Sequence, residues 1–418
     1  MCRSDLDALV AAAHERYRRA RPRSAAAHER ARQVLPGGNT RSVLHFEPFP
    51  FRVAEARGSR LTDIDGHSYI DFCGNYTAGL LGHDPEGVRR AIHRALESGW
   101  AVGATHPREV ELAERICARF PNIDAVRFTN SGTEANLMAI GTALHHTGRT
   151  GVGVFDHGYH GGVLSFGDLD GPHNPLNVPH RFVVAPYDDE TGLDALFADA
   201  DLGCVLIEAV QGSGGCRPAT VEFLTELRRR CDDSGTLLIL DEVMTSRLAP
   251  GGVQELYGLR ADLTTLGKYL GGGMTFGAFG GRAEIMAHFD PGAGGSLTQA
   301  GTFNNNVVTM AAAVAALDRE LTPERIAAVN ALGDDLRAAL VAVFEDSTLP
   351  LWITGLGSMN CIHSDEPRLS ELLFHHLLDH GIYIARRGFL ALSVEITEAD
   401  VTTLVETVEE WTRTVAGR

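Results

Sequence analysis

Short apolar runs alternate with amphipathic segments through the middle of the chain. From residue 107 onward, a segment with helical spacing is followed by a short, mostly apolar run and then by a glycine-rich loop, and this order repeats. Such alternation predicts an α/β fold with an open, mostly parallel sheet that binds its ligand at the carboxyl ends of the strands. The expected strands include residues 125–129, 152–155, 204–208 and 237–240, and residues 221–232 form one of the expected helices.

The start of the chain has a different pattern. Residues 5–35 have the spacing of one or two amphipathic helices, which end at Pro36-Gly37-Gly38. Polar and apolar residues nearly alternate over residues 60–72, and the alternation breaks at Asp65-Gly66. Because Asp-Gly is favoured in tight turns between paired strands, this segment predicts a β-hairpin.

The end of the chain predicts a second, smaller domain. After about residue 306 the sequence is rich in alanine and helical, over residues 310–321 and 323–343. Short strands are expected near residues 351–363 and 381–396, as in an α+β arrangement. The predicted organisation is an N-terminal segment, residues 1–55, that packs with the small domain; a large ligand-binding domain, residues 56–306; and a C-terminal small α+β domain, residues 307–418.

Composition narrows the classes of partner. The 37 basic and 54 acidic residues give a formal net charge of −17, and so acidic a chain repels nucleic acid. No apolar run approaches the roughly 18 residues that span a bilayer, and residues 1–24 lack the apolar stretch of a signal peptide. The seven cysteines include no CxxC pair, which argues against a disulfide framework or a cysteine zinc site. We expect a cytoplasmic protein without a metal, in which His375, His376 and His380 form a partly exposed helix face.

Lysine is almost absent from the chain. Of the 37 basic residues 36 are arginine, and Lys268 is the one lysine. Arginine keeps its proton at any accessible pH, whereas a buried lysine can lose it, and only a primary amine forms an imine. Lys268 follows the apolar and hydroxyl-bearing stretch Leu263–Gly267 and precedes three glycines, which allow a ligand to approach the backbone closely. This neighbourhood favours a chemical role over a solvated surface charge.

Familiar nucleotide-binding and hydrolase motifs do not fit the sequence. In a P-loop, Asp262 would have to be glycine, and Tyr269 would have to be serine or threonine. No GxGxxG follows an expected strand, and neither GxSxG nor HExxH occurs. The sequence therefore gives no support for an ATPase, a nicotinamide dehydrogenase, a serine hydrolase or a zinc protease.

Small and polar residues follow several of the expected strands. Residues 128–136, Phe-Thr-Asn-Ser-Gly-Thr-Glu-Ala-Asn, leave a strand and open a helix, where backbone N–H groups suit a phosphate. A glycine-rich loop, residues 156–162, carries the aromatic Tyr159, and Asp241 ends a strongly apolar strand where a carboxylate needs a cation or donors. Each feature alone also fits a helix cap or an ordinary turn. Together with Lys268 they describe a site for pyridoxal phosphate.

These segments resemble the class III aminotransferases, which are fold-type I pyridoxal phosphate (PLP)-dependent transferases, over essentially the whole chain. The similarity is greatest to the branch that holds β-phenylalanine aminotransferase and glutamate-1-semialdehyde aminomutase. The resemblance implies an α/β large domain with a central, mostly parallel sheet and a smaller α+β domain built from the N- and C-terminal segments. The matching runs are residues 39–44, 128–138, 158–164, 241–250, 263–269, 301–306 and 387–389.

The resemblance also implies the roles of individual residues. Lys268 forms the aldimine with pyridoxal 5′-phosphate and then moves the substrate proton, and Asp241 pairs with the pyridine nitrogen. Thr302 reaches the phosphate of the neighbouring subunit's cofactor, so the active unit is a homodimer with shared active sites. The remaining cofactor-binding residues are Ser131, Gly132 and Thr133 at the phosphate, Tyr159 and Val243 on the two faces of the ring, and Glu208 and Gln211 at its edge.

Two arginines align with carboxylate-binding residues of the β-phenylalanine enzymes. Arg41 lies in an N-terminal loop and Arg387 in a short C-terminal loop, and a planar guanidinium suits a carboxylate. An apolar pocket for the rest of the substrate is expected beside Arg41. Its expected lining residues are Leu44, Phe46, Phe49 and Phe51.

The expected reaction is transfer of an amino group from a β-amino acid, with an aromatic one favoured, to 2-oxoglutarate or pyruvate. Three alternatives stay open at this point. The first is an aminomutase of the glutamate-1-semialdehyde type, which moves the amine within one substrate. The second is a biosynthetic aminotransferase for another β-amino or keto substrate. The third is a non-catalytic protein that binds pyridoxal phosphate, although the net charge of −17 argues against a DNA-binding regulator.

Overall fold

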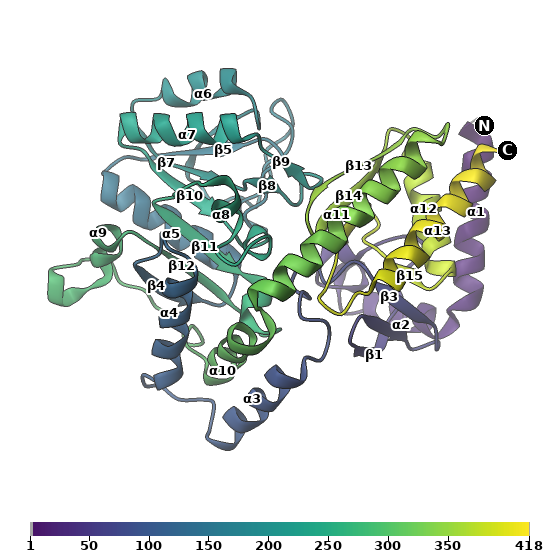
Figure 1. The fold of residues 1–418 in the computed structure, drawn as a ribbon, viewed down its shortest axis with the longest axis horizontal. Coiled ribbons are helices and arrows are strands. Elements are labelled where there is room, and N and C mark those ends of the chain that lie inside the picture. Colours follow the sequence, from purple (N-terminus) through teal and green to yellow (C-terminus); the bar gives the residue numbers. More distant parts are fainter. Residues whose placement is uncertain (1–2, 418) are drawn as a thin grey trace. The chain divides into compact units, whose positions relative to one another are not determined.

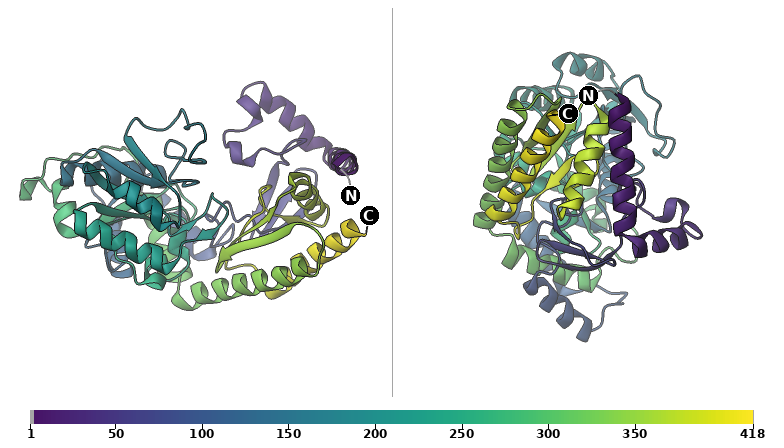
Figure 2. Two further views of the ribbon diagram at one scale, coloured as in Figure 1. Left: turned by 90° about the horizontal axis from the view of Figure 1, so that it is seen from above. Right: turned by 90° about the vertical axis from the view of Figure 1, so that its right-hand side faces the viewer.

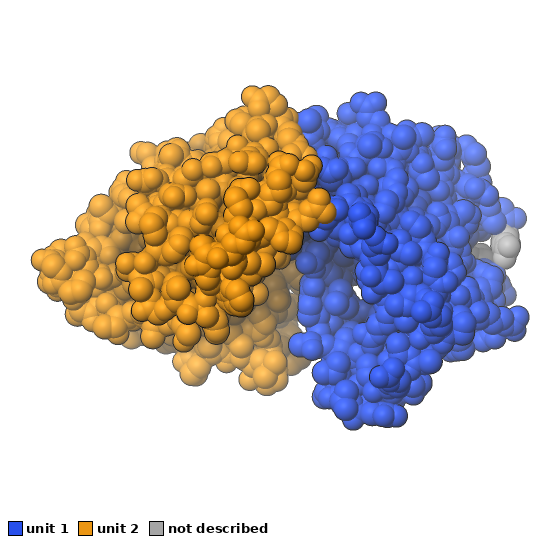
Figure 3. All heavy atoms as spheres, turned by 90° about the horizontal axis from the view of Figure 1, so that it is seen from below, with its two compact units in different colours: residues 1–84, 328–418 blue, residues 85–327 orange. Residues whose placement is uncertain are grey.

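The computed structural model describes residues 3–417, which divide into two compact units. The first unit contains the residues up to Asp84 and those from Ala328 onward, and the second contains Pro85–Ala327. Figure 3 shows the first unit in blue and the second in orange. No helix within residues 3–417 is long and apolar enough to cross a membrane.

These boundaries differ from the predicted ones at residues 55/56 and 306/307, and strand pairing and helix packing explain why. Strand β3 (Ser68–Asp71) pairs in parallel with β15 (Ile382–Tyr383), so the segment before Asp84 belongs with the end of the chain. Helix α10 (Val307–Ala315) packs against α3 (Glu86–Glu97) and α4 (Pro107–Arg119), so it belongs with the middle of the chain. Neither long-range contact leaves a signal in the local sequence pattern.

A seven-stranded sheet forms the centre of the second unit (Figure 1). β12 runs antiparallel to both of its neighbours, and the other pairs of adjacent strands are parallel, so the predicted mostly parallel sheet is confirmed. Most of the strands are buried along their whole length, which is why they form short apolar runs in the sequence. In spatial order the strands are β4 (Ala125–Thr129), β12 (Gly277–Gly281), β11 (Leu263–Gly267), β10 (Leu237–Asp241), β7 (Leu202–Ile207), β5 (Gly151–Phe155) and β6 (Arg181–Ala185).

Helices and one short hairpin surround this sheet. Helix α5 (Gly132–Thr147) packs against β7, β10, β11 and β12, and its apolar residues form a buried core with those of the strands. Helix α7 (Val221–Ser234) begins with Thr220 as its N-cap and ends at Gly235, whose φ of +69° suits glycine. The other elements are α6 (Glu190–Phe197), α8 (Val253–Tyr257), α9 (Ala283–Met286), and the hairpin β8 (Val210–Gln211) with β9 (Arg217–Pro218).

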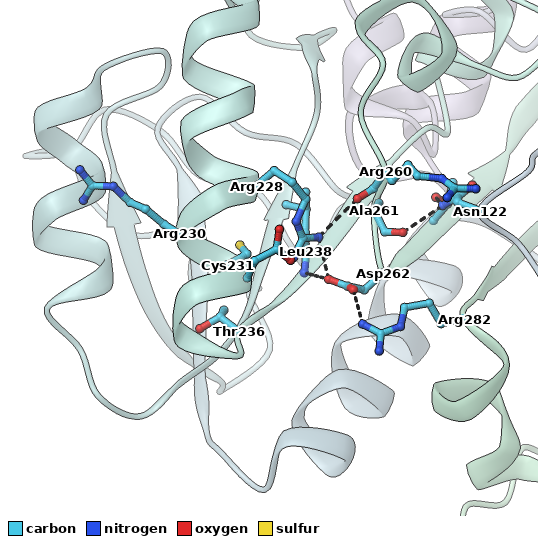
Figure 4. A network of polar contacts seen from close by, with 12 residues as sticks. Asn122, Arg228, Arg230, Cys231, Thr236, Leu238, Arg260, Ala261, Asp262 and Arg282 are labelled. Carbon is cyan, nitrogen blue, oxygen red and sulfur yellow. Dashed lines mark hydrogen bonds and ion pairs between the residues drawn. The ribbon is translucent and has the colours of Figure 1, made fainter.

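An ion-pair network lies at the amino ends of β10 and β11 (Figure 4). Asp262 precedes β11, and its two carboxylate oxygens each lie 2.8 Å from a guanidinium nitrogen, one of Arg228 and one of Arg282. The same carboxylate accepts the backbone N–H of Leu238 at 2.8 Å. Because this carboxylate ties α7 to the starts of two strands, its role is structural.

The first unit contains two sheets and a row of helices. The predicted hairpin is confirmed as β2 (Arg60–Asp63) and β3, which pair antiparallel, and Gly66 in the turn has a φ of +98°. Its four-stranded sheet has the order β1 (Val53–Arg57), β2, β3, β15, and its three-stranded sheet has the order β13 (Leu351–Leu356), β14 (Met359–Ser364), β16 (Phe389–Ala391). The helices are α1 (Arg3–Ala20), α2 (Pro22–Arg32), α12 (Pro367–Asp379), α13 (Glu398–Ala416) and, from Ala328 onward, α11 (Pro323–Glu345).

Three helices of the first unit lie side by side. Figure 2 shows α1, α12 and α13 next to one another, and α12 packs against both of the others. The amphipathic segment predicted at the N-terminus forms two helices, α1 and α2, and Pro22 starts the second of them. Helix α13 begins with a capping box, in which Thr397 and Asp400 each accept the other's backbone N–H.

Candidate active site

Lys268 stands directly after β11, at the start of a single 3-10 turn that ends at Gly271. The residue is half-buried, and its φ of +53° lies in the left-handed region that residues other than glycine seldom occupy. Such strain is held in place by the surrounding structure and is concentrated at functional sites. The fold thus places this lysine at the carboxyl end of a central strand with a fixed backbone.

Asp241 ends the neighbouring strand β10 and is 4% exposed. Its Oδ2 accepts a hydrogen bond from Nδ2 of Asn136 at 2.8 Å and lies 2.8 Å from Nδ1 of His160. Its Oδ1 accepts the backbone N–H of Val243 at 2.9 Å. The expectation that this buried carboxylate meets polar partners is confirmed, and the partners fix its orientation.

The beginning of α5 forms a turn of small residues. Ser131 is the N-cap, and its hydroxyl accepts the backbone N–H three residues further on at 3.1 Å. A Cβ atom at Gly132 would overlap the side chain of Val243, and one at Gly161 would overlap Thr133. The backbone therefore packs tightly here, and the helix N-terminus offers N–H groups and its positive dipole end to an anion.

The loop after β5 carries Tyr159, which is 41% exposed, so part of this residue is accessible. Its backbone N–H donates to Oε2 of Glu208 at 3.0 Å, and the N–H of Gly212 donates to Oε1 at 3.1 Å. Burial raises the pKa of Glu208 above its ordinary value, even though His160 beside it acts in the other direction. Glu208 therefore anchors the backbone of this loop, and its contact with a cofactor stays a prediction.

Gln211 and Thr302 have different surroundings. Gln211 is buried, and its amide donates to the carbonyl of Asp156 at 2.6 Å and accepts from Arg217 at 2.7 Å. The geometry thus gives Gln211 a role in holding the loop after β5, and its contact with a cofactor stays a prediction. Thr302 is exposed in the segment before α10, and its role toward a neighbouring subunit also stays a prediction.

The second unit therefore gathers one cluster of candidate residues at the carboxyl ends of β4, β5, β10 and β11. Val243 connects its parts, because both Gly132 at the start of α5 and Gly267 before Lys268 lie against its side chain. An amine, a buried carboxylate, a helix N-terminus and an accessible aromatic ring together provide a nucleophile, a fixed charge, an anion site and a stacking surface.

The first unit holds both arginines that were predicted to bind substrate. The guanidinium carbon of Arg41 lies 5.6 Å from the ring centroid of Tyr76, and that of Arg387 lies 5.5 Å from the same centroid. Nη1 of Arg41 also donates to Oδ1 of Asn75 at 2.7 Å. Two arginines that are far apart in the sequence therefore converge on one aromatic ring.

A cavity of about 300 Å³ lies beside Arg41 in the first unit. Leu44, Phe46 and Phe51 line it, as predicted, whereas Phe49 is not among its lining residues and is buried elsewhere in the core. The volume lies at the lower end of the range for small-molecule sites. A small apolar group next to a carboxylate would suit this cavity.

The family model that describes the class III aminotransferases matches residues 44–410. That range covers most of the chain and includes every residue of the cluster in the second unit. The chain belongs to the class III aminotransferases. It is thus an enzyme of this family, and the family resemblance and the fold class expected from the sequence are confirmed.

Curated relatives and solved structures agree with the family. The chain is 45% identical over 416 residues to a β-phenylalanine transaminase from Variovorax paradoxus, which covers 96% of this chain and 95% of that protein. A solved β-phenylalanine aminotransferase from the same organism superposes with a TM-score of 0.95, with 44% identity and 98% of each chain covered. A glutamate-1-semialdehyde 2,1-aminomutase from Methanopyrus kandleri is 36% identical over 419 residues, with 93% of this chain and 97% of that protein covered.

Class III aminotransferases use pyridoxal 5′-phosphate. A solved transaminase with this cofactor bound is 34% identical to the chain, with a TM-score of 0.87 and 95% and 98% of the two chains covered. The residues present fit the cofactor, because α5 begins at Gly132 with Ser131 as its N-cap, and a helix N-terminus of this kind suits a phosphate. The buried Asp241 would suit its ring nitrogen, and Lys268 would supply the amine that the cofactor's aldehyde requires.

The structure adds residues that the sequence did not single out for a role. Asn136 and His160 contact Asp241, and although both lie in the polar segments after strands, only their packing identifies them as its partners. Asn75 and Tyr76 contact the two arginines, and the preceding Gly74 is a weak signal of the left-handed turn that contains them.

The three C-terminal histidines do not share one exposed face, contrary to the expectation. His375 is 1% exposed, and its Nε2 lies 3.3 Å from Oε1 of Glu371, because α12 packs against α1 on this side. Nε2 of His14 reaches the same oxygen at 3.1 Å. Within residues 3–417, His14, Glu371 and His375 form the one group of His, Cys, Asp or Glu side chains that lie close enough together to hold a metal ion. The expectation that the protein holds no metal stays a prediction.

We expect Glu371→Gln to lower the free energy of unfolding by about 2 kcal/mol at pH 7. Burial alone would raise the pKa of Glu371, but hydrogen bonds from His375, Arg386 and His14 lower it from 4.5 to about 2. Because the folded-state pKa lies below the ordinary value, the carboxylate stabilises the fold at neutral pH. This contribution is lost as the pH falls from about 4.5 toward 2.

Urea unfolding at pH 7 and pH 3 measures this difference. The exposed Glu406, changed to glutamine, is the control and is expected to unfold like the unmodified protein at both pH values. A loss of stability in Glu371→Gln that is the same at pH 7 and pH 3 would show that the ionised carboxylate is not responsible.

Proposed function

We propose that this enzyme transfers the amino group of a β-amino acid, preferably an aromatic one, to 2-oxoglutarate or pyruvate. The observation that carries the donor class is the convergence of Arg41 and Arg387 on Tyr76 beside an apolar cavity. Paired guanidinium groups suit a carboxylate, and the cavity suits an apolar side chain next to it. The name of the Variovorax relative, a β-phenylalanine transaminase, supports the same donor.

The chain's own residues would perform the following steps. When bound, pyridoxal 5′-phosphate supplies an aldehyde for the amine and a ring that accepts the electron pair left on the substrate carbon. Asp241, held by its polar partners, keeps a negative charge that favours a protonated ring nitrogen. The amine of Lys268 would accept the proton from the substrate carbon that bears the amino group and then donate it to the former aldehyde carbon (C4′) of the cofactor, as a general base followed by a general acid.

The cofactor would be held by groups around these two residues. The N–H groups and hydroxyls of Ser131, Gly132 and Thr133 bind its phosphate in this proposal, supported by their place at the N-terminus of α5. Tyr159 and Val243 would contact the two faces of its ring. The exposure of Tyr159 and the position of Val243 between Gly132 and Gly267 support these roles.

A homodimer with shared active sites and a cytoplasmic location complete the proposal. Thr302 is exposed, and its neighbour Phe303 is a large apolar side chain that is 62% exposed, as expected for a surface that meets a second subunit. The six cysteines within residues 3–417 form no disulfide bond with one another, which supports a reducing compartment.

A half-reaction without an acceptor tests the donor. The holoenzyme is mixed with β-phenylalanine or with α-phenylalanine, and the absorption of the bound cofactor and the mass of the released product are followed. We expect one equivalent of β-keto acid from the β-isomer and little product from the α-isomer, because moving the amine from C3 to C2 brings it one bond closer to the carboxylate and one bond further from the phenyl ring.

Each other outcome points to a different function. Product from the α-isomer alone would overturn the β-amino acid donor. The 36% identity to a glutamate-1-semialdehyde aminomutase makes that reaction the second candidate, and it would show as an isomerised substrate with no keto acid released. No reaction with any amine, while the cofactor is bound, would indicate a non-catalytic protein.

A further inference from the structure

A strained turn follows β3 in the first unit. Four consecutive residues have positive φ angles: Gly74 at +50°, Asn75 at +47°, Tyr76 at +54° and Thr77 at +74°. The left-handed region is unfavourable for residues other than glycine, and three such residues in a row are rare. A conformation of this kind persists only where the rest of the structure fixes it.

The body of the first unit fixes this turn. Oδ1 of Asp71 accepts the backbone N–H groups of Cys73 at 2.9 Å and Gly74 at 3.1 Å. Oδ2 of the same carboxylate lies 3.1 Å from Nε2 of His83. Gly74 packs so closely against the carbonyl oxygen of Ala391 that a Cβ atom would overlap it. The turn is therefore anchored at its start, and the direction of the Tyr76 side chain is set.

Tyr76 contacts both of the segments that carry the arginines. Its hydroxyl donates to the carbonyl of Val43 at 2.9 Å, two residues after Arg41. Its ring stacks on Phe389, two residues after Arg387, with centroids 5.9 Å apart and an interplanar angle of 19°. Both guanidinium groups lie within 6 Å of the centre of the same ring. One side chain thus joins two loops from opposite ends of the sequence.

We propose that Tyr76 is a positioning residue for the substrate's carboxylate and acts by holding Arg41 and Arg387 together. Two guanidinium cations repel each other, and the negative face of an aromatic ring attracts both, so the ring offsets part of that repulsion. Asn75 supports the arrangement by accepting a hydrogen bond from Arg41. The proposal rests on the proposed function, in which these arginines bind the carboxylate.

The test measures binding of a carboxylate and of its neutral counterpart to the holoenzyme. The probes are 3-phenylpropanoate, which is β-phenylalanine without its amine, and 3-phenylpropanamide, and calorimetry gives both dissociation constants. Tyr76→Asn removes the ring while tolerating the positive φ, and Tyr76→Phe removes only the hydroxyl. We expect the dissociation constant of the carboxylate to rise about tenfold or more in Tyr76→Asn and about threefold in Tyr76→Phe. The amide should bind as before in both variants.

Two kinds of control variant accompany these measurements. Tyr69 is buried in β3, the strand before the turn that carries Tyr76. Its hydroxyl contacts Arg21 and Asp63 but neither predicted substrate arginine. Tyr69→Phe should therefore leave the dissociation constants of both probes unchanged. Arg41→Ala and Arg387→Ala test the underlying assignment and should each weaken binding of the carboxylate selectively. Thermal unfolding and cofactor absorption confirm that each variant is folded.

The outcomes separate this proposal from the proposed function. If neither arginine variant weakens binding of 3-phenylpropanoate, the carboxylate assignment fails, and the role of Tyr76 fails with it. If both arginine variants weaken it while Tyr76→Asn does not, the arginines stand and the role of Tyr76 is overturned. If Tyr76→Asn weakens binding of the carboxylate and of the amide equally, the role of Tyr76 is also overturned, because the ring would then only shape the cavity.

Discussion

Lys268→Ala is expected to lower kcat by about 10⁴-fold or more and to remove the imine absorption of the bound cofactor. A methyl group neither forms an imine nor carries a proton from one carbon to another. The loss should appear in the half-reaction with β-phenylalanine alone, followed by stopped-flow absorption, because that reaction contains the proton transfer. Binding of the cofactor itself should survive, since the phosphate and ring contacts do not require the lysine.

Two further variants separate the chemistry of Lys268 from its charge and its backbone. Lys268→Arg keeps a positive charge but neither loses its proton nor forms an imine, so it should be as inactive as the alanine variant. Lys268→Asn tolerates the positive φ of this position and excludes backbone strain as the cause. Normal turnover in any of the three would contradict the assignment.

Asp241→Asn is expected to lower kcat by about 10²- to 10³-fold. An amide has nearly the same shape as the carboxylate but no charge, so it no longer favours a protonated ring nitrogen when the cofactor is bound. Asn136 and His160 both contact Oδ2 of the carboxylate, and these contacts weaken as well when a neutral amide takes its place. Steady-state kinetics with saturating cofactor and the absorption of the bound cofactor measure the effect.

Asp262→Asn is the matched control for this variant. Asp262 is a buried carboxylate at the other end of the same pair of strands, held by Arg228 and Arg282. Asp262→Asn should lower the melting temperature but leave kcat of the folded enzyme within about twofold of the original value. The reason is that breaking a buried ion-pair network away from the candidate site affects stability. Similar losses of kcat in both variants would show that the effect of Asp241→Asn comes from damage to the sheet.

Local pattern located most of the central sheet but not all of it. Strands β5, β7 and β10 are buried along their whole length, and β4 is buried only at its end, but all four form a short, mostly apolar run in the sequence. Strand β12 is Gly-Ala-Phe-Gly-Gly, which resembles a loop, and its glycines are needed because Cβ atoms at Gly277 and Gly280 would overlap the backbone of neighbouring segments. A strand of this kind follows from packing and has no propensity signal of its own.

The candidate residues of the second unit could be predicted only in part. In the second unit, Ser131 caps α5 and Asp241 ends β10, and both follow from short stretches in which a strand gives way to a loop. The partners of Asp241 come from separate segments, Asn136 in α5 and His160 in the loop after β5. The need for partners was therefore predictable, and their identity was not.

The amino-acid sequence was enough to predict the fold class, the family and the candidate residues for the chemistry, because these predictions depend on strand–loop–helix segments that are continuous in the chain. Tertiary structure alone decided the domain boundaries and the grouping of Arg41, Tyr76 and Arg387. The parallel pairing of β3 with β15 and the packing of Gly74 against Ala391 join residues from opposite ends of the sequence. Contacts between segments so far apart depend on the three-dimensional packing of the whole unit, and no local pattern records them.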